Sequence, residues 1–138
     1  MKVVIDTNVF VSSVFGGIPQ QVVQLWFDGR LTLCLSEPIV TEYQRVLREI
    51  GAVSEAEERA LIEAFTSEEG VLYTANPPAI EGVSSNPEDD KFPESALELE
   101  AECVASGDSD LLEMGSYMGI PIFTPREVLE QIGEAPGE

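Results

Sequence analysis

The chain has 138 residues, 43% of them hydrophobic, which is enough to bury a core of its own as one domain. It contains 2 cysteines and no histidine, which excludes Ser–His and Cys–His catalysis and argues against a zinc site. The 26 acidic and 7 basic residues give a net charge of −19, which repels nucleic acid at ordinary salt. Such a charge is typical of halophilic proteins adapted to molar intracellular salt, and a basic protein partner is the alternative explanation.

Short β-branched runs alternate with amphipathic stretches along the chain. In chain order they predict a strand at 2–5, a helix at 19–29, a strand at 31–35, a helix at 36–51, a helix at 54–65, an edge strand at 71–74, a helix at 90–100, a strand at 103–106, a helix at 110–118, a strand at 120–123 and a helix from Pro125. The apolar run from Val9 to Phe15 receives no assignment, and segment 76–88, which holds three prolines, is predicted to be irregular. Ser54 marks a helix start and Gly51 a helix end, by the usual preferences for capping residues.

This alternation of strands and helices predicts the α/β class, with a central, mainly parallel sheet covered by helices on both faces. We expect a single domain over residues 1–132, followed by a short acidic tail at 133–138. No internal repeat or second domain is evident.

Neither export nor a membrane span is predicted. Asp6 interrupts the apolar stretch at the N-terminus, and no apolar run approaches the roughly 20 residues that a bilayer requires. Cys34 and Cys103 each lie inside an apolar run, as expected of buried thiols in a reducing compartment. We therefore expect a cytoplasmic protein without membrane contact.

Acidic residues recur near the ends of the predicted strands and helices. Those that can meet at one edge of the sheet are Asp6, Glu42, Asp90, Asp108 and Asp110. Ligands of an open parallel sheet bind outside the carboxyl ends of its strands, and clustered carboxylates repel one another unless a cation lies between them. Ligation by oxygen alone favours Mg²⁺ or Mn²⁺, which can activate water for attack on a phosphodiester.

Four sequence blocks in this order resemble the PIN-domain nucleases: VIDTNVF, SEPIVTEYQRVL, NPEDDKF and SGDSDLL. The resemblance runs from Met1 to about Ile132 and is greatest to the prokaryotic branch regarded as toxins of toxin–antitoxin pairs. It implies a three-layer α/β/α fold and a metal-dependent endoribonuclease that cleaves single-stranded RNA. It also implies an antitoxin protein as partner and a homodimer.

Matched block by block, the resemblance assigns catalysis to an acidic quartet and metal binding to three of its members and one further aspartate. The quartet is Asp6, Glu42, Asp90 and Asp108, and the metal ligands are Asp6, Asp90, Asp108 and Asp110. Glu42 would complete the cluster or orient the attacking water. Asn8 and Ser106 match polar positions that line such sites.

The chain departs from the family pattern at three positions, none of which removes a quartet acid. Asn86 stands where the family often has aspartate, and Pro93 replaces an apolar residue in a first helical turn that tolerates proline. Glu100 stands where a glycine commonly ends the helix, so we expect that end to be frayed or lengthened.

Structural roles are the alternative for each acid. Asp6 and Asp90 can cap the elements they precede, and Glu42 can pair with Arg45 three residues on. Of Asp108 and Asp110, we expect Asp110 to cap the helix that follows. Capping and metal binding are compatible.

Several neighbouring residues also have two interpretations. Asp89 is expected to be a solvated neighbour of the site and not a ligand. Trp26 and Phe27 are expected to be core or dimer contacts in preference to platforms for stacked bases. The remaining candidates, for phosphate contact or simply for charged surface, are Arg45, Arg48 and Lys91.

Two rival functions come from other classes. An aspartate-dependent phosphatase also places an aspartate after its first strand, but it needs a second acid where this chain has Asn8. It also needs a lysine between the acidic blocks, and none stands between Lys2 and Lys91. A non-catalytic PIN-like binding module would be expected to lose quartet acids, all of which are present here.

Overall fold

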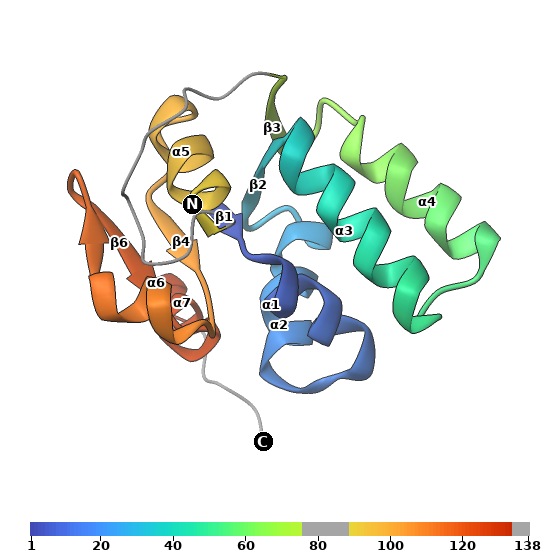
Figure 1. Ribbon diagram of the computed structural model, residues 1–138, viewed down its shortest axis with the longest axis horizontal. Coiled ribbons are helices and arrows are strands. Elements are labelled where there is room, and N and C mark those ends of the chain that lie inside the picture. Colours follow the sequence, from blue (N-terminus) through green and yellow to red (C-terminus); the bar gives the residue numbers. More distant parts are fainter. Residues whose placement is uncertain (76–88, 134–138) are drawn as a thin grey trace.

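The computed structural model describes residues 1–75 and 89–133, which form strands alternating with helices (Figure 1). The strands are β1 (Lys2–Ile5), β2 (Thr32–Ser36), β3 (Val71–Thr74), β4 (Cys103–Ala105), β5 (Ser116–Tyr117) and β6 (Ile120–Phe123). The helices are α1 (Thr7–Ser12), the 3-10 helix η1 (Ser13–Phe15), α2 (Gly17–Phe27), α3 (Glu37–Ile50), α4 (Glu55–Phe65), α5 (Lys91–Glu98), α6 (Ser109–Met114) and α7 (Pro125–Ile132). Within these described ranges, no helix is both long and apolar enough to cross a membrane.

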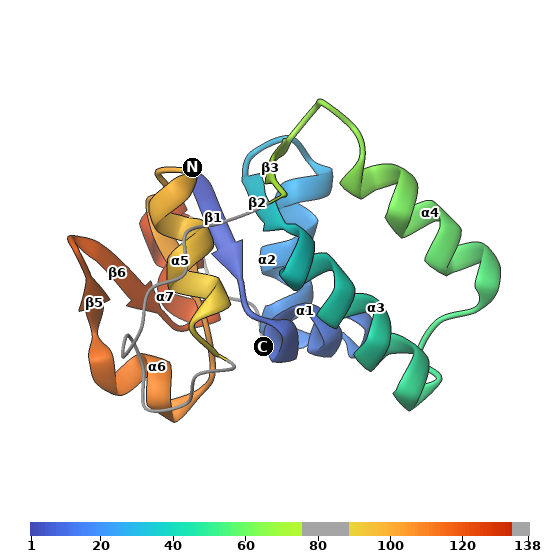
Figure 2. The same cartoon turned by 45° about the horizontal axis from the view of Figure 1, so that its top comes forward.

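The strands form one sheet in the order β3-β2-β1-β4-β6-β5, and every neighbouring pair is parallel except β5 and β6. Helix α5 packs on one face against β1, β2 and β4, whereas α2 lies on the other face (Figures 1 and 2). The predicted α/β class and the three-layer fold with a mainly parallel sheet are confirmed, as is the edge position of β3. The predicted irregular segment 76–88 lies outside the described residues.

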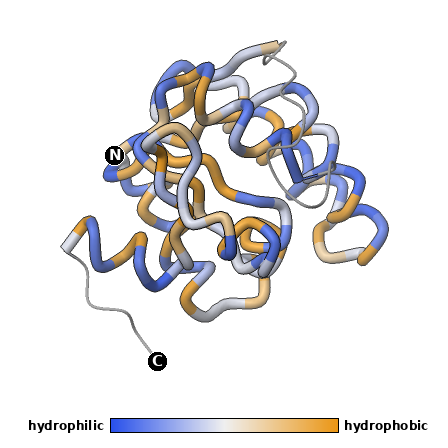
Figure 3. Tube along the Cα trace, turned by 60° about the vertical axis from the view of Figure 1, so that its left-hand side comes forward, coloured by the Kyte–Doolittle hydropathy of each residue, from blue (hydrophilic) through white to orange (hydrophobic). Residues whose placement is uncertain are grey.

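The core lies between the sheet and its helices. Val3, Val4 and Ile5 of β1 are fully buried, as expected of a central strand that is covered on both faces. The outer helices are amphipathic, and in Figure 3 polar and apolar residues alternate along α7. Val128 and Leu129 form the buried side of that helix.

An aromatic cluster joins α1, α2, α3 and α4. The Phe10 ring stacks on Tyr43 with centroids 4.3 Å apart and lies 5.6 Å from Phe65. Trp26 stacks on Phe65 at 5.8 Å and is buried, so it is a core residue and is not available to a dimer partner. Phe27 remains 56% exposed.

The structure corrects the sequence-based assignment at three places. The unassigned run after β1 is helical, because Asp6 caps α1 and the β-branched residues there hid the helical period. Helix α6 ends at Met114 and not at 118, because Gly115 turns the chain into β5 with a φ of 75°. Helix α5 ends at Glu98 and is not lengthened, and Glu100 takes the left-handed φ of 54° that a glycine would adopt without strain.

Both cysteines are free, buried thiols, as predicted. Burial raises the pKa of Cys34 to about 11 and that of Cys103 to about 12. Thiols with such values are un-ionised at neutral pH and serve as apolar core residues.

Candidate metal centre

The site forms where the strand order reverses. β1 and β4 are parallel neighbours, with Ile5 opposite Ala105 at their carboxyl ends. The next residue, Asp6, donates its backbone N–H to the Ala105 carbonyl at 2.9 Å. The side chains of the residues that follow β1 and β4 therefore emerge together at the switch point of the sheet, where α/β proteins bind ligands.

A hydrogen-bonded chain links the ends of these two strands. Asp6 is buried and caps α1, with Oδ1 accepting the Val9 N–H at 3.0 Å. Its other oxygen, Oδ2, accepts a hydrogen bond from the Ser106 hydroxyl. Ser106 Oγ in turn accepts the Asp108 N–H at 2.9 Å, so the Asp6 carboxylate orients the loop that carries Asp108. Asp6 thus both caps α1 and belongs to the site.

Three aspartates place carboxylate oxygens close together at this switch point of the sheet. Oxygens of Asp89, Asp108 and Asp110 lie within 4.8 Å of one another. Asp108 also caps α6 by accepting the Asp110 N–H at 2.7 Å, so the cap is Asp108 and the sequence-based choice of Asp110 is wrong. The reason is local: Asp108 has extended backbone angles, whereas Asp110 already lies in the first helical turn.

The start of α5 presents Asp89, and not Asp90, to this cluster. Asp90 is buried at the helix N-terminus, and its role as a metal ligand stays a prediction. Consecutive residues at a helix start point about 100° apart, so the two aspartates direct their carboxylates differently. Among the described residues, no donor reaches the buried Oδ2 atom of Asp89.

Burial and charge repulsion both act on the acids of the site. Burial, followed by the charges of Asp108 and Asp6, raises the pKa of Asp89 to about 6. Burial also raises the pKa of Asp6 against the effect of its hydrogen bonds. A bound cation would relieve this repulsion and supply a partner for the orphaned oxygen of Asp89. The cluster therefore fits a hard divalent cation such as Mg²⁺ or Mn²⁺.

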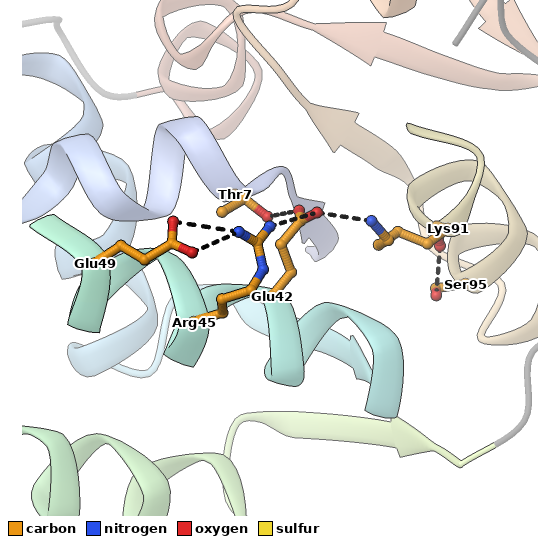
Figure 4. A network of polar contacts seen from close by, with 6 residues as sticks. All are labelled: Thr7, Glu42, Arg45, Glu49, Lys91 and Ser95. Carbon is orange, nitrogen blue, oxygen red and sulfur yellow. Dashed lines mark hydrogen bonds and ion pairs between the residues drawn. The ribbon is translucent and has the colours of Figure 1, made fainter. Parts of the chain in front are cut away.

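Glu42 stands beside the cluster and is held by protein donors (Figure 4). Its Oε2 accepts the Thr7 hydroxyl, and its Oε1 accepts Lys91 Nζ at 2.8 Å. The expected pairing with Arg45 is present but longer, at 3.8 Å. Burial alone would raise the pKa of Glu42, but the hydrogen bonds from Lys91 and Thr7 hold that pKa below its usual value. Glu42 is thus an ionised anchor with both oxygens occupied.

The structure brings Asp89 into the cluster, where only a solvated neighbour was expected, and it adds Thr7 to the site. Lys91, a candidate for phosphate contact, is bonded to Glu42. Thr7 directly follows Asp6 in the sequence. The run Asp89-Asp90-Lys91 indicated that more than one of these three side chains could face the site. Of the other basic candidates, Arg48 pairs with Glu58 at 2.6 Å and so has the structural role of joining α3 to α4. Ser106 lies where it was expected, whereas Asn8 is exposed on α1.

A pH effect follows from the raised pKa of Asp89. The native carboxyl, at about 6, binds its proton more tightly than the unfolded one, whose pKa is about 3.9. Its contribution to stability is therefore present at low pH and lost as pH rises through about 6. In EDTA, the free energy of unfolding of wild type, relative to that of Asp89→Asn, should rise by about 1 kcal/mol when the pH is lowered from 7.5 to 5. This value is reduced for solvent screening. Urea unfolding at several pH values measures this difference.

The matched control is Asp28→Asn, because Asp28 is exposed and accepts its hydrogen bond from Gln24. Comparison with this variant removes the effect of the many other acids that titrate. If the stability difference between wild type and Asp89→Asn does not change with pH, the pKa of Asp89 is not raised in the folded protein.

Comparisons with known proteins agree with this geometry. The family model described as "PIN domain" matches residues 2–110, which include Asp6, Glu42, Asp89 and Asp108. The chain is also similar to a curated protein of Methanocaldococcus jannaschii named "Uncharacterized protein MJ1680". The two are 28% identical over an alignment that covers 95% of this chain and 91% of that protein.

Proposed function

Because this chain belongs to the PIN domain family, whose members are in general metal-dependent nucleases, we propose that it is a Mg²⁺- or Mn²⁺-dependent endoribonuclease acting on single-stranded RNA. The observation that carries the proposal is the cluster of Asp89, Asp108 and Asp110 at the carboxyl ends of the central strands. An orphaned carboxylate oxygen in that cluster has the chemistry of a cation ligand and not of a structural hydrogen bond.

Each residue of the centre has a distinct part in this proposal. Asp89, Asp108 and Asp110 hold the cation, with Asp6 and the buried Asp90 as the further acids that the family resemblance assigns. When bound, the cation supplies charge that stabilises the phosphate as negative charge develops on it, and it acidifies water. Ser106 holds Asp6 and the Asp108 backbone in register through two hydrogen bonds. Rigid placement of this kind is what positions a phosphodiester for attack.

The biological setting in the proposal is a toxin that a protein antitoxin neutralises, acting as a homodimer in the cytoplasm. These assignments rest on the family resemblance. The acidic surface suits a basic antitoxin, since opposite charges accelerate and strengthen association. Of Trp26 and Phe27, the aromatic residues expected to be core or dimer contacts, Trp26 is buried and Phe27 is exposed. Phe15 is also exposed, at 73%.

Cleavage of a labelled single-stranded RNA with Mn²⁺, with Mg²⁺ and with EDTA tests the activity. We expect internal cuts with 5′-phosphate and 3′-hydroxyl ends in either metal and none in EDTA. p-Nitrophenyl phosphate in the same buffers tests the phosphatase alternative, and we expect no turnover. RNA that stays intact in every metal and salt condition would leave a binding module as the better assignment.

Salt should change this activity in an unusual direction. At a net charge of −19, long-range repulsion keeps RNA away at low salt. Raising KCl from about 0.1 M to about 1 M shortens the Debye length from ~10 Å to ~3 Å and screens this repulsion. Initial cleavage rates and melting temperatures should both rise across that series at fixed Mn²⁺. A steady fall of both from the lowest salt upward would mean that the acidity serves a basic partner and not a saline cytoplasm.

A further inference from the structure

We propose that the groove between α3 and the start of α5 binds a backbone phosphate of the RNA next to the scissile one, with Lys91 as its main contact and Glu42 as the residue that positions Lys91. This inference rests on the proposed function and adds the path of the substrate. In this inference Glu42 acts by holding a lysine in position, whereas the family resemblance assigns Glu42 to the acidic quartet.

The groove adjoins the metal centre. It has a volume of about 500 Å³, and its lining includes Glu37, Thr41, Glu42, Arg45 and Lys91. Glu42 belongs to both places, since it lines the groove and its charge acts on Asp6. The groove and the acidic site therefore have Glu42 in common, which places the groove next to the site where the scissile phosphate would lie.

Lys91 is pre-positioned for a phosphate oxygen. Its Nζ is 2.8 Å from Glu42 Oε1 and 5.6 Å from the centroid of the Phe92 ring. An ammonium group has three donors, and the bond to Glu42 takes one of them. The side chain is 19% exposed, so the group is fixed but reachable. Figure 4 shows Lys91 reaching from α5 toward the Glu42 carboxylate on α3.

Arg45 is the second cation of the groove. It pairs with Glu49 at 3.1 Å and more loosely with Glu42, and its side chain is 56% exposed. Together Arg45 and Lys91 balance the carboxylates of Glu37 and Glu42 in the lining. In a chain with a net charge of −19, a lining without net charge is where a phosphate meets less repulsion.

A purely structural role is the competing explanation, because the pair of Lys91 and Glu42 also joins α5 to α3. The two roles differ in their salt dependence. A lysine that contacts phosphate releases a counterion on binding, so its loss shifts the slope of log affinity against log salt by about +0.7 for a single strand. Loss of a structural cross-link weakens the fold without changing that slope.

The experiment compares Lys91→Gln and Lys91→Arg with the wild-type protein. The control is Arg59→Gln, which removes one positive charge from the exposed side of α4, outside the site. Anisotropy of a fluorescein-labelled single-stranded RNA in Ca²⁺ gives Kd across a KCl series. Titration with Mn²⁺ in the absence of RNA gives metal affinity. Thermal melts confirm that each variant is folded.

We expect Lys91→Gln to raise the Kd for RNA about tenfold and to shift the slope of log affinity against log salt by about +0.7. Lys91→Arg should restore most of the affinity, and Arg59→Gln should change Kd less than about twofold. Mn²⁺ affinity should not fall in Lys91→Gln, because the lysine is not a ligand and its charge opposes the cation.

Several results would overturn the inference. An unchanged salt slope in Lys91→Gln would leave only the structural role, and an equal effect of Arg59→Gln would leave only general charge. Lower Mn²⁺ affinity in Lys91→Gln would mean that the lysine organises the metal centre instead. Wild type that neither binds nor cleaves RNA would remove the proposed function as well, whereas wild-type cleavage with an unaffected Lys91→Gln removes this inference alone.

Discussion

Replacing Asp108 with asparagine is expected to abolish RNA cleavage while the protein stays folded. Asp108 shares the cation cluster with Asp89 and Asp110, and loss of its charge removes several kcal/mol of stabilisation of the transition state. Cleavage should fall at least about a thousandfold. The asparagine oxygen can still accept the Asp110 N–H, so the cap of α6 is retained. The metal-free variant should be as stable as wild type or more so, since a repulsion is relieved.

The measurements are initial cleavage rates in Mn²⁺, Mn²⁺ affinity and urea unfolding in EDTA. Asp6→Asn should behave in the same way, because Asp6 orients the Asp108 loop through Ser106. Glu113→Gln removes a carboxylate from the exposed side of α6 and should leave the cleavage rate, the Mn²⁺ affinity and the stability unchanged. Wild-type cleavage by Asp108→Asn would disprove the assignment of the metal centre.

The largest effect on stability is expected for Phe10→Ala. Phe10 is 1% exposed and touches Tyr43, Phe65 and Trp26 at the junction of α1 with α2, α3 and α4. Truncation of a buried phenylalanine costs about 3–5 kcal/mol in lost burial and in the cavity that remains. Urea unfolding monitored by Trp26 fluorescence measures the change, since Trp26 lies in the same cluster.

Phe15→Ala is the matched control, because Phe15 is 73% exposed and its loss should cost less than about 0.5 kcal/mol. Similar losses in the two variants would mean that the aromatic cluster does not stabilise the fold as its packing suggests. The outcome also bears on the site, since α1 begins with the Asp6 cap and carries Thr7.

The positions of the acids along the sequence were sufficient to predict that carboxylates gather at the ends of β1 and β4. Asp6 follows a β-branched run, and Asp108 follows another, so the rule that parallel strands bind ligands at their carboxyl ends brings the two together. The β-branched and amphipathic periods likewise predicted every strand but β5, the longer helices and their layering, because each period reports which face of an element is buried.

What the sequence by itself determined is therefore the α/β architecture, the buried thiols and the edge of the sheet at which the carboxylates gather. Only the tertiary structure decided which atoms meet there: Asp89 joins Asp108, and Lys91 reaches Glu42 across 49 residues of chain. The physical reason is that periodicity records burial over several residues, whereas the direction of one carboxylate depends on where a helix starts. That start is set by packing between segments far apart in the chain, which local patterns do not contain.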